Sequence, residues 1–186
     1  MTRNTPEISE MIERLELLST SELSNVSWPG ESLLAVIPAD SSGLTARLHA
    51  CEILLRRDQE KFLGVIGAQT VAPIYVSALK ERATTDLNPW AFLGPGDLGP
   101  MGLHLVACGD SAMTLLATLL DIKQSAGIYS GSKESKLGNS DHARICDFAA
   151  FFISRIRRFP YSFHRHSIAL RDAEIEQLKE KLQEPL

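Results

Sequence analysis

The chain has 186 residues, 44% of them hydrophobic and 23% charged, a balance typical of one globular domain with its own core. The net charge of −4 and pI of about 5.7 exclude a general electrostatic attraction to nucleic acid or anionic lipid. Three scattered cysteines do not form a disulfide framework, and the polar N-terminal stretch lacks the apolar core of a secretory signal. Since no apolar run is long enough to span a membrane, we expect a cytoplasmic protein.

Apolar residues recur at helical spacing through the first half of the chain. The pattern predicts a helix that begins at Thr5 as N-cap, with Pro6 in its first turn. It predicts further helices over 44–57 and 71–82, and a short helix or packed loop around 62–66.

Residues 84–102 contain three prolines and four glycines, together with Trp90 and Phe92. Aromatic residues would anchor such a segment, whereas a flexible linker would be polar. We therefore expect one domain over 1–186, in which 84–99 is an ordered loop that joins two halves, 1–83 and 100–186.

The second half is also helical by its apolar spacing. Helices are predicted over 101–108, 110–121 and 145–158, and a last one begins near Ser167 with exposed Glu and Lys pairs. No segment alternates as a strand does, apart from the partly β-branched run within the helix predicted at 71–82. The sequence predicts an all-α fold.

Two segments resemble each other: residues 47–54 (RLHACEIL) and 145–153 (ICDFAAFFI) carry small residues, a nearby acidic residue and an apolar residue one turn later. Residues 109–121 (GDSAMTLLATLLD) have the spaced leucines of a partner helix. Together these segments resemble HEAT repeats, most clearly over 109–153. The resemblance implies a HEAT-like stack of antiparallel helical hairpins, either a short α-solenoid or an orthogonal bundle.

A polar segment at 123–142 is longer than a helical hairpin needs. A long loop on a rigid helical scaffold is typical of a recognition element. The alternative is a solvated insertion whose Gly, Ser and Asn residues make turns. If the segment binds a partner, the contacting residues we expect are Tyr129, Ser132, Lys133, Glu134, Lys136 and Asn139.

A basic and aromatic stretch follows the helix predicted at 145–158. It contains Arg155, Arg157, Arg158, Arg165, Arg171, His164 and His166, interleaved with Phe159, Tyr161 and Phe163. This composition predicts contact with an acidic protein or RNA; the alternative is a helix end neutralised by the acidic last helix. Arg157, Arg158 and His164 complete the predicted partner-binding set.

Arg158 and His164 also resemble the Arg-x(4–6)-His signature of HEPN ribonucleases, which implies metal-independent RNA cleavage. Pro160 breaks the helix between them, however, and basic residues at a helix C-terminus are favoured by the dipole alone. No metal site is predicted, because His164 and His166 lack acidic or cysteine ligands at a known spacing. No cofactor motif is present.

Two acidic residues, Glu52 and Asp147, lie at equivalent places in the two similar segments. Inside helices of this kind we expect them to be buried and paired, with Arg47 and Arg144 respectively. The cysteines have no adjacent His or Lys to activate a thiol, so nucleophilic roles are not expected.

These observations favour a non-catalytic macromolecule-binding protein, such as an adaptor, an immunity-type inhibitor or an assembly subunit. Another protein is the expected partner, and RNA is the weaker candidate. The alternatives are a HEPN-like ribonuclease and a structural subunit that self-associates through its last helix.

Overall fold

The computed structural model describes residues 7–91, 98–131, 133–164 and 166–183, and the side chains of 133, 134 and 137 fall outside this description. Within these ranges the chain forms ten α-helices, one 3-10 helix and no β-strand, which confirms the all-α prediction. The elements are α1 (Ile8–Leu17), η1 (Glu22–Asn25), α2 (Gly30–Val36), α3 (Leu44–Arg57), α4 (Gln59–Ile66), α5 (Ala68–Glu81), α6 (Pro100–Ala107), α7 (Asp110–Ala117), α8 (Lys133–Ser140), α9 (Ile145–Arg157) and α10 (Ile168–Gln183).

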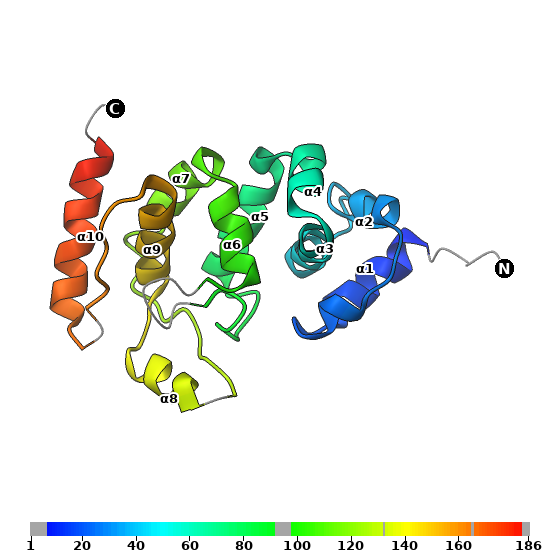
Figure 1. Ribbon diagram of the computed structural model, residues 1–186. Coiled ribbons are helices and arrows are strands. Elements are labelled where there is room, and N and C mark those ends of the chain that lie inside the picture. Colours follow the sequence, from blue (N-terminus) through cyan, green and yellow to red (C-terminus); the bar gives the residue numbers. More distant parts are fainter. Residues whose placement is uncertain (1–6, 92–97, 132, 165, 184–186) are drawn as a thin grey trace.

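The helices follow one another across the molecule nearly in chain order, from α1 at one end to α10 at the other (Figure 1). Helix α3 packs against α1, α2, α4, α5 and α6, and α5 then contacts α6 and α7. Helix α9 lies against α6 and α7 on one side and α10 on the other. The short helix α8 projects away from this row beside the start of α9 (Figure 1).

Two helices, α3 and α9, form the centre of the core because they are buried on nearly every side. In α9, all residues from Ile145 to Ser154 are buried, and Phe148 and Phe152 are fully enclosed. Most of the buried positions in both helices carry apolar side chains, as a helix enclosed on several sides requires, and the buried acids Glu52 and Asp147 are exceptions. The buried side chains of the N-terminal and C-terminal halves belong to one continuous cluster.

Helices α4 and α5 meet at Gly67, where the chain bends by 101°. Gly67 has φ 86°, a backbone conformation that residues with a side chain rarely adopt. Among the described helices, none alone combines the length and apolar composition of a membrane span, and the one pair that does so together is this bent pair.

Several predicted boundaries are confirmed and others shift. Helix α3 occupies 44–57 as predicted, whereas α5 begins at Ala68, so Pro73 lies inside the helix and not in its first turn. The helix predicted over 110–121 ends at Ala117. The segment at 123–142, expected as an expanded loop, contains α8. The predicted cap residues Thr5 and Pro6, and Phe92, lie outside the described residues.

Trp90 anchors the ordered part of the Pro/Gly-rich segment. Its side chain is 1% exposed, and its indole N–H donates to the Thr84 hydroxyl at 3.0 Å. Its ring lies 6.2 Å from that of Tyr75 and 6.0 Å from that of Phe152. Trp90 thus contacts aromatic residues of both α5 and α9.

Glu52 is fully buried at the centre of α3 and has three side-chain partners. One carboxylate oxygen accepts from the Tyr75 hydroxyl at 2.5 Å and from His104 Nδ1 at 2.7 Å, and the other accepts from Arg56 Nε at 2.8 Å. Burial alone would raise the pKa of Glu52, but these donors outweigh it and hold the pKa below its usual value. The predicted pairing with Arg47 is wrong, because that guanidinium donates to the Ala39 carbonyl.

Candidate binding site

Helix α9 is fixed at its start by a buried ionic network around Asp147. The Asp147 carboxylate accepts from the backbone N–H of Arg144 at 2.9 Å and from its guanidinium at 2.8 and 3.1 Å. Arg171 of α10 donates to the same carboxylate at 3.1 Å and is itself 1% exposed. The predicted pairing of Asp147 with Arg144 is confirmed, and Arg171 adds a second buried cation that joins α10 to α9.

Helix α9 ends at a residue in the left-handed backbone conformation, Arg158, with φ 58° and ψ 33°. This geometry turns the backbone N–H groups of both Arg158 and Phe159 toward the Ser154 carbonyl, which accepts from the second at 3.0 Å. Pro160 follows and cannot continue the helix. The chain therefore folds back over the last turns of α9 as a short strap, residues 158–161.

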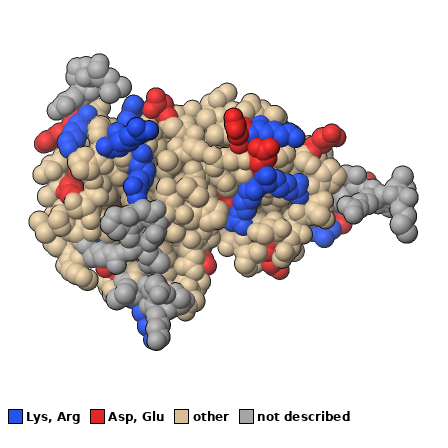
Figure 2. All heavy atoms as spheres, in the orientation of Figure 1, with Lys and Arg blue, Asp and Glu red and all other residues tan. Residues whose placement is uncertain are grey.

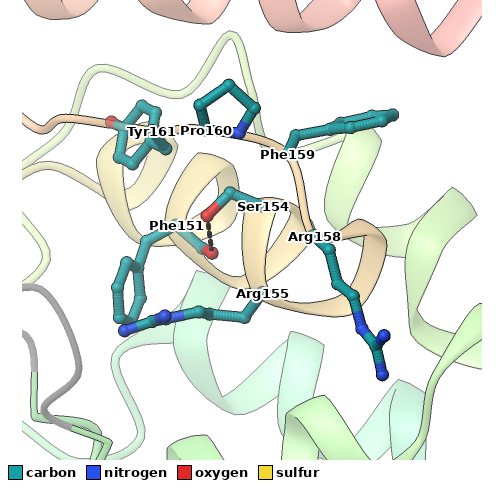
Figure 3. A pocket seen from close by; sticks show the side chains of 7 residues that line it. All are labelled: Phe151, Ser154, Arg155, Arg158, Phe159, Pro160 and Tyr161. Carbon is teal, nitrogen blue, oxygen red and sulfur yellow. Dashed lines mark hydrogen bonds between the residues drawn. The ribbon is translucent and has the colours of Figure 1, made fainter.

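A groove of about 450 Å³ lies between the strap and α9 (Figure 3). We call it the α9 groove; its lining residues are Phe151, Ser154, Arg155, Arg158, Phe159, Pro160 and Tyr161. Its walls are largely aromatic, and the Ser154 hydroxyl donates to the Phe151 carbonyl and so offers little to a ligand. The remaining polar groups are two guanidinium groups and one phenol.

The two arginines of the α9 groove have no acidic partner within the described ranges. The Arg155 guanidinium lies over the Phe151 ring, 5.2 Å from its centroid, which holds it in place without neutralising it. Arg158 is exposed at the helix end. Arg157, between them, differs because it pairs with Asp110 at 3.3 Å. Figure 2 shows a strip of basic side chains in the region of α9, whereas over α2–α4 basic and acidic side chains lie side by side.

Two hydrogen-bond donors of the groove are buried without an acceptor in the described part of the chain: Arg155 Nε and the Tyr161 hydroxyl. An unmade bond of this kind costs about 1–3 kcal/mol. Burial raises the pKa of Tyr161 well above its usual value, so the phenol keeps its proton and stays a donor.

The strap also borders helix α10. A second cavity of about 200 Å³ lies on that side, lined by Pro160, Tyr161 and α10 residues that include Glu174 and Lys181. Lys181 lies over the Phe159 ring at 5.9 Å, and the Glu174 carboxylate accepts from the Ser162 backbone N–H at 2.8 Å. The strap is thus attached to α9 at one end and to α10 at the other, with space on both sides.

Two other cavities in the described structure lack unpaired cations. Near η1, a cavity of about 300 Å³ includes Arg14, which stacks on Trp28 and pairs with Glu10 at 3.6 Å. A cavity of about 420 Å³ between α1 and α3 is lined mainly by hydroxyls and by the acids Glu16 and Asp86. The α9 groove therefore combines unpaired positive charge with an apolar surface in a way that these two do not.

The residues predicted in the segment at 123–142 are placed differently. Tyr129 is 3% exposed, and its backbone N–H and carbonyl bond to the Asn139 side chain at 2.6 and 2.8 Å. These two residues therefore hold α8 against the preceding chain, and the Tyr129 side chain is not accessible to a partner here. Lys136 is exposed. Ser132 and the side chains of Lys133 and Glu134 lie outside the described residues.

Of the remaining predicted residues, Arg157 and Arg158 lie at the far end of α9. This helix has 13 residues and so is about 20 Å long, and α8 lies beside its start (Figure 1). The structure therefore separates these two arginines from the residues predicted in the segment at 123–142. His164 follows the strap, with Nε2 3.8 Å from Glu174. Whether either group contacts a partner stays a prediction.

Phe151 and Arg155 line the groove but do not belong to the predicted partner-binding set. Positions 151, 155 and 158 are spaced by four and three residues, so they share one face of α9. That spacing indicates a common face, but the apolar residues at 148, 149, 152 and 153 dominate the helical pattern of this segment. Arg171, counted in the predicted basic patch, is instead buried against Asp147.

The described residues contain no group of three or more His, Cys, Asp or Glu side chains arranged to hold a metal ion. The three cysteines are buried, and burial raises the pKa of Cys108 to about 12 and of Cys146 to about 11. The pKa of Cys51 is raised still further by burial. Thiols of this kind are poor nucleophiles.

No protein family model, curated protein or solved structure matches this chain.

Proposed function

We propose that this chain is a non-catalytic binding protein, an adaptor with a HEAT-like scaffold that acts in the cytoplasm, and that its α9 groove binds an acidic segment of another protein. One observation carries the proposal: two arginines without acidic partners among the described residues line one groove with aromatic walls. The chain-order packing of α3, α5, α7 and α9 supports the HEAT-like part of the proposal.

The composition of the groove is that of a protein-binding surface. Arg, Tyr and Phe are enriched at the centres of such surfaces, where they supply most of the binding energy. A carboxylate bound to Arg155 would form a charge-assisted hydrogen bond, and the apolar walls would exclude water from it. Arg155 is already oriented by Phe151, so less side-chain entropy is lost on binding.

An acidic protein fits the groove better than RNA does. The net charge of −4 opposes the approach of a polyanion, and binding to a phosphate backbone draws on many cations spread along a surface. Here two cations lie in one groove, and the neighbouring α10 presents Glu174 and Glu176. A short acidic segment needs no more than those two.

The test is fluorescence anisotropy with a labelled Glu-rich peptide that contains aromatic residues, compared with a Lys-rich peptide and with single-stranded RNA. We expect the acidic peptide alone to bind. Arg155→Gln and Arg158→Gln should each weaken binding about tenfold, which is about 1.4 kcal/mol. Arg82→Gln is the matched control, since Arg82 is exposed and also ends a helix in the left-handed conformation.

Equal affinity of the wild type and of a variant that carries both Arg155→Gln and Arg158→Gln for the acidic peptide would refute the proposed site. Cleavage of the RNA without metal, lost in His164→Ala, would instead favour the ribonuclease alternative. Light scattering on the same samples tests the self-association alternative, because that alternative requires oligomers in the absence of any peptide.

A further inference from the structure

We infer that the α9 groove selects an extended segment with two acidic residues separated by three positions and an apolar residue midway between them. The pattern is acid–x–apolar–x–acid. This inference rests on the proposed function, and it adds the sequence preference of the partner.

The two cations of the α9 groove do not converge. Figure 3 shows the Arg155 and Arg158 guanidinium groups pointing to opposite sides of the groove, the former beside Phe151 and the latter away from the strap. Arg155 is held in that direction by stacking on the Phe151 ring at 5.2 Å. A single carboxylate therefore does not reach both, and a ligand that neutralises both must carry two separate anions.

Apart from the two arginines, the lining of the groove is largely apolar. It includes the strap residues Phe159, Pro160 and Tyr161 above Ser154, whose hydroxyl is already donated to the Phe151 carbonyl. An acidic side chain placed there would lose water and find no second cation. An apolar side chain placed there is favoured, because it removes apolar surface from water.

The spacing of the ligand's side chains determines its backbone conformation. In an extended chain, residues i, i+2 and i+4 point to one side, and i and i+4 are about 13 Å apart. This spacing leaves room for one apolar side chain between two acids. In a helix, residues i and i+4 are only about 6 Å apart and residue i+2 points to another side, so no apolar side chain would lie between the two acids.

The test compares two labelled peptides of identical composition and charge. One contains the central sequence Glu-Ser-Phe-Ser-Glu, and the other contains Ser-Glu-Glu-Phe-Ser. We expect the first to bind at least about tenfold more tightly to the full chain by fluorescence anisotropy, a difference of about 1.4 kcal/mol. Equal affinities would overturn the inference while leaving the proposed acidic-segment function intact, and no binding of either peptide would overturn both.

A double-mutant cycle gives the second, independent readout. Each Glu of the first peptide is replaced by Gln, and each peptide is measured against Arg155→Gln, Arg158→Gln and the control Arg82→Gln. We expect each groove arginine to be coupled to one glutamate and not to the other. Equal coupling of both arginines to both glutamates would refute the two-ended arrangement. Circular dichroism of every variant excludes a loss of fold as the cause.

Discussion

The buried carboxylate of Asp147 offers the sharpest test of what holds α10 in place. The perturbation is Asp147→Asn, which keeps the size of the side chain and removes its charge. In the native chain this carboxylate accepts three hydrogen bonds from Arg144 and one from Arg171, besides a longer one from the Cys146 thiol at 3.9 Å. Its side chain is fully buried, and that of Arg171 is 1% exposed.

The substitution leaves two arginines facing a neutral amide, half of which is itself a donor. Removing one partner of a buried ion pair costs about 3–5 kcal/mol, because the remaining charge stays buried without compensation. Arg144 retains Asp172 at 2.8 Å, whereas Arg171 retains the Asp141 carbonyl alone among its described polar partners. We therefore place the loss mainly on α10, which carries Arg171.

The assay is urea unfolding followed by circular dichroism, together with the melting temperature. A loss of about 3–5 kcal/mol corresponds to a drop of roughly 6–20 °C for a chain of this size. Asp121→Asn is the control, because Asp121 pairs with Lys179 at the surface with its side chain 83% exposed, and we expect no measurable change there. A loss below about 1 kcal/mol for Asp147→Asn would show that the network is replaceable and refute the reasoning.

Three further outcomes are expected. Burial lowers the pKa of His49, so this side chain stays neutral in the native state, whereas in the unfolded chain it takes up a proton below about pH 6.5. The free energy of unfolding should therefore decrease as the pH is lowered through that region. His49→Asn should make the decrease smaller, which denaturation at two pH values measures. Arg158→Gly should raise stability by roughly 0.5–1 kcal/mol, since glycine adopts the positive φ without strain, and should weaken binding of the acidic peptide. Arg82→Gly should raise stability by a similar amount and leave peptide binding unchanged. Weaker binding in Arg82→Gly with unchanged binding in Arg158→Gly would count against the α9 groove. The native protein should show no fast-reacting thiol at neutral pH, and all three cysteines should react with a thiol reagent after unfolding, since burial suppresses their thiolates.

The parts of the fold that depend on local spacing were predictable from the sequence. Helix α3 matches its predicted range because its apolar period is regular and Gly43 and Asp58 flank it. The pairing of Asp147 with Arg144 joins residues three positions apart, within the first turn of one helix. Such features need no knowledge of the tertiary structure.

Features that depend on distant residues were not predictable. Helix α8 contains Gly138, Asn139 and Ser140, which favour turns, and the Asn139 side chain bonds to the Tyr129 backbone ten positions away. The Glu52 partners Tyr75 and His104 are 23 and 52 positions away. No local pattern encodes these contacts.

The candidate site falls between these two cases. Arg155 and Arg158 were visible as charges, and their common helix face follows from their spacing. The acidic residues of α10 were the expected partners of these two arginines. Whether they reach the arginines depends on where α10 lies, which the local sequence does not determine. In the structure, Glu174 bonds to Ser162 and Glu176 to Lys179, so they are engaged elsewhere.

The strap that walls the α9 groove is attached at one end to the Ser154 carbonyl and at the other to α10 through the bond from Ser162 to Glu174. Ligand binding and the docking of α10 therefore share a structural element, and their free energies are linked. If an acidic segment binds more tightly when α10 is docked, then its binding shifts the docking equilibrium of α10 toward the docked form. The two factors, the gain in affinity and the shift of the equilibrium, are equal. Occupancy of the groove would then appear as slower hydrogen exchange along α10, a helix that the ligand itself need not touch.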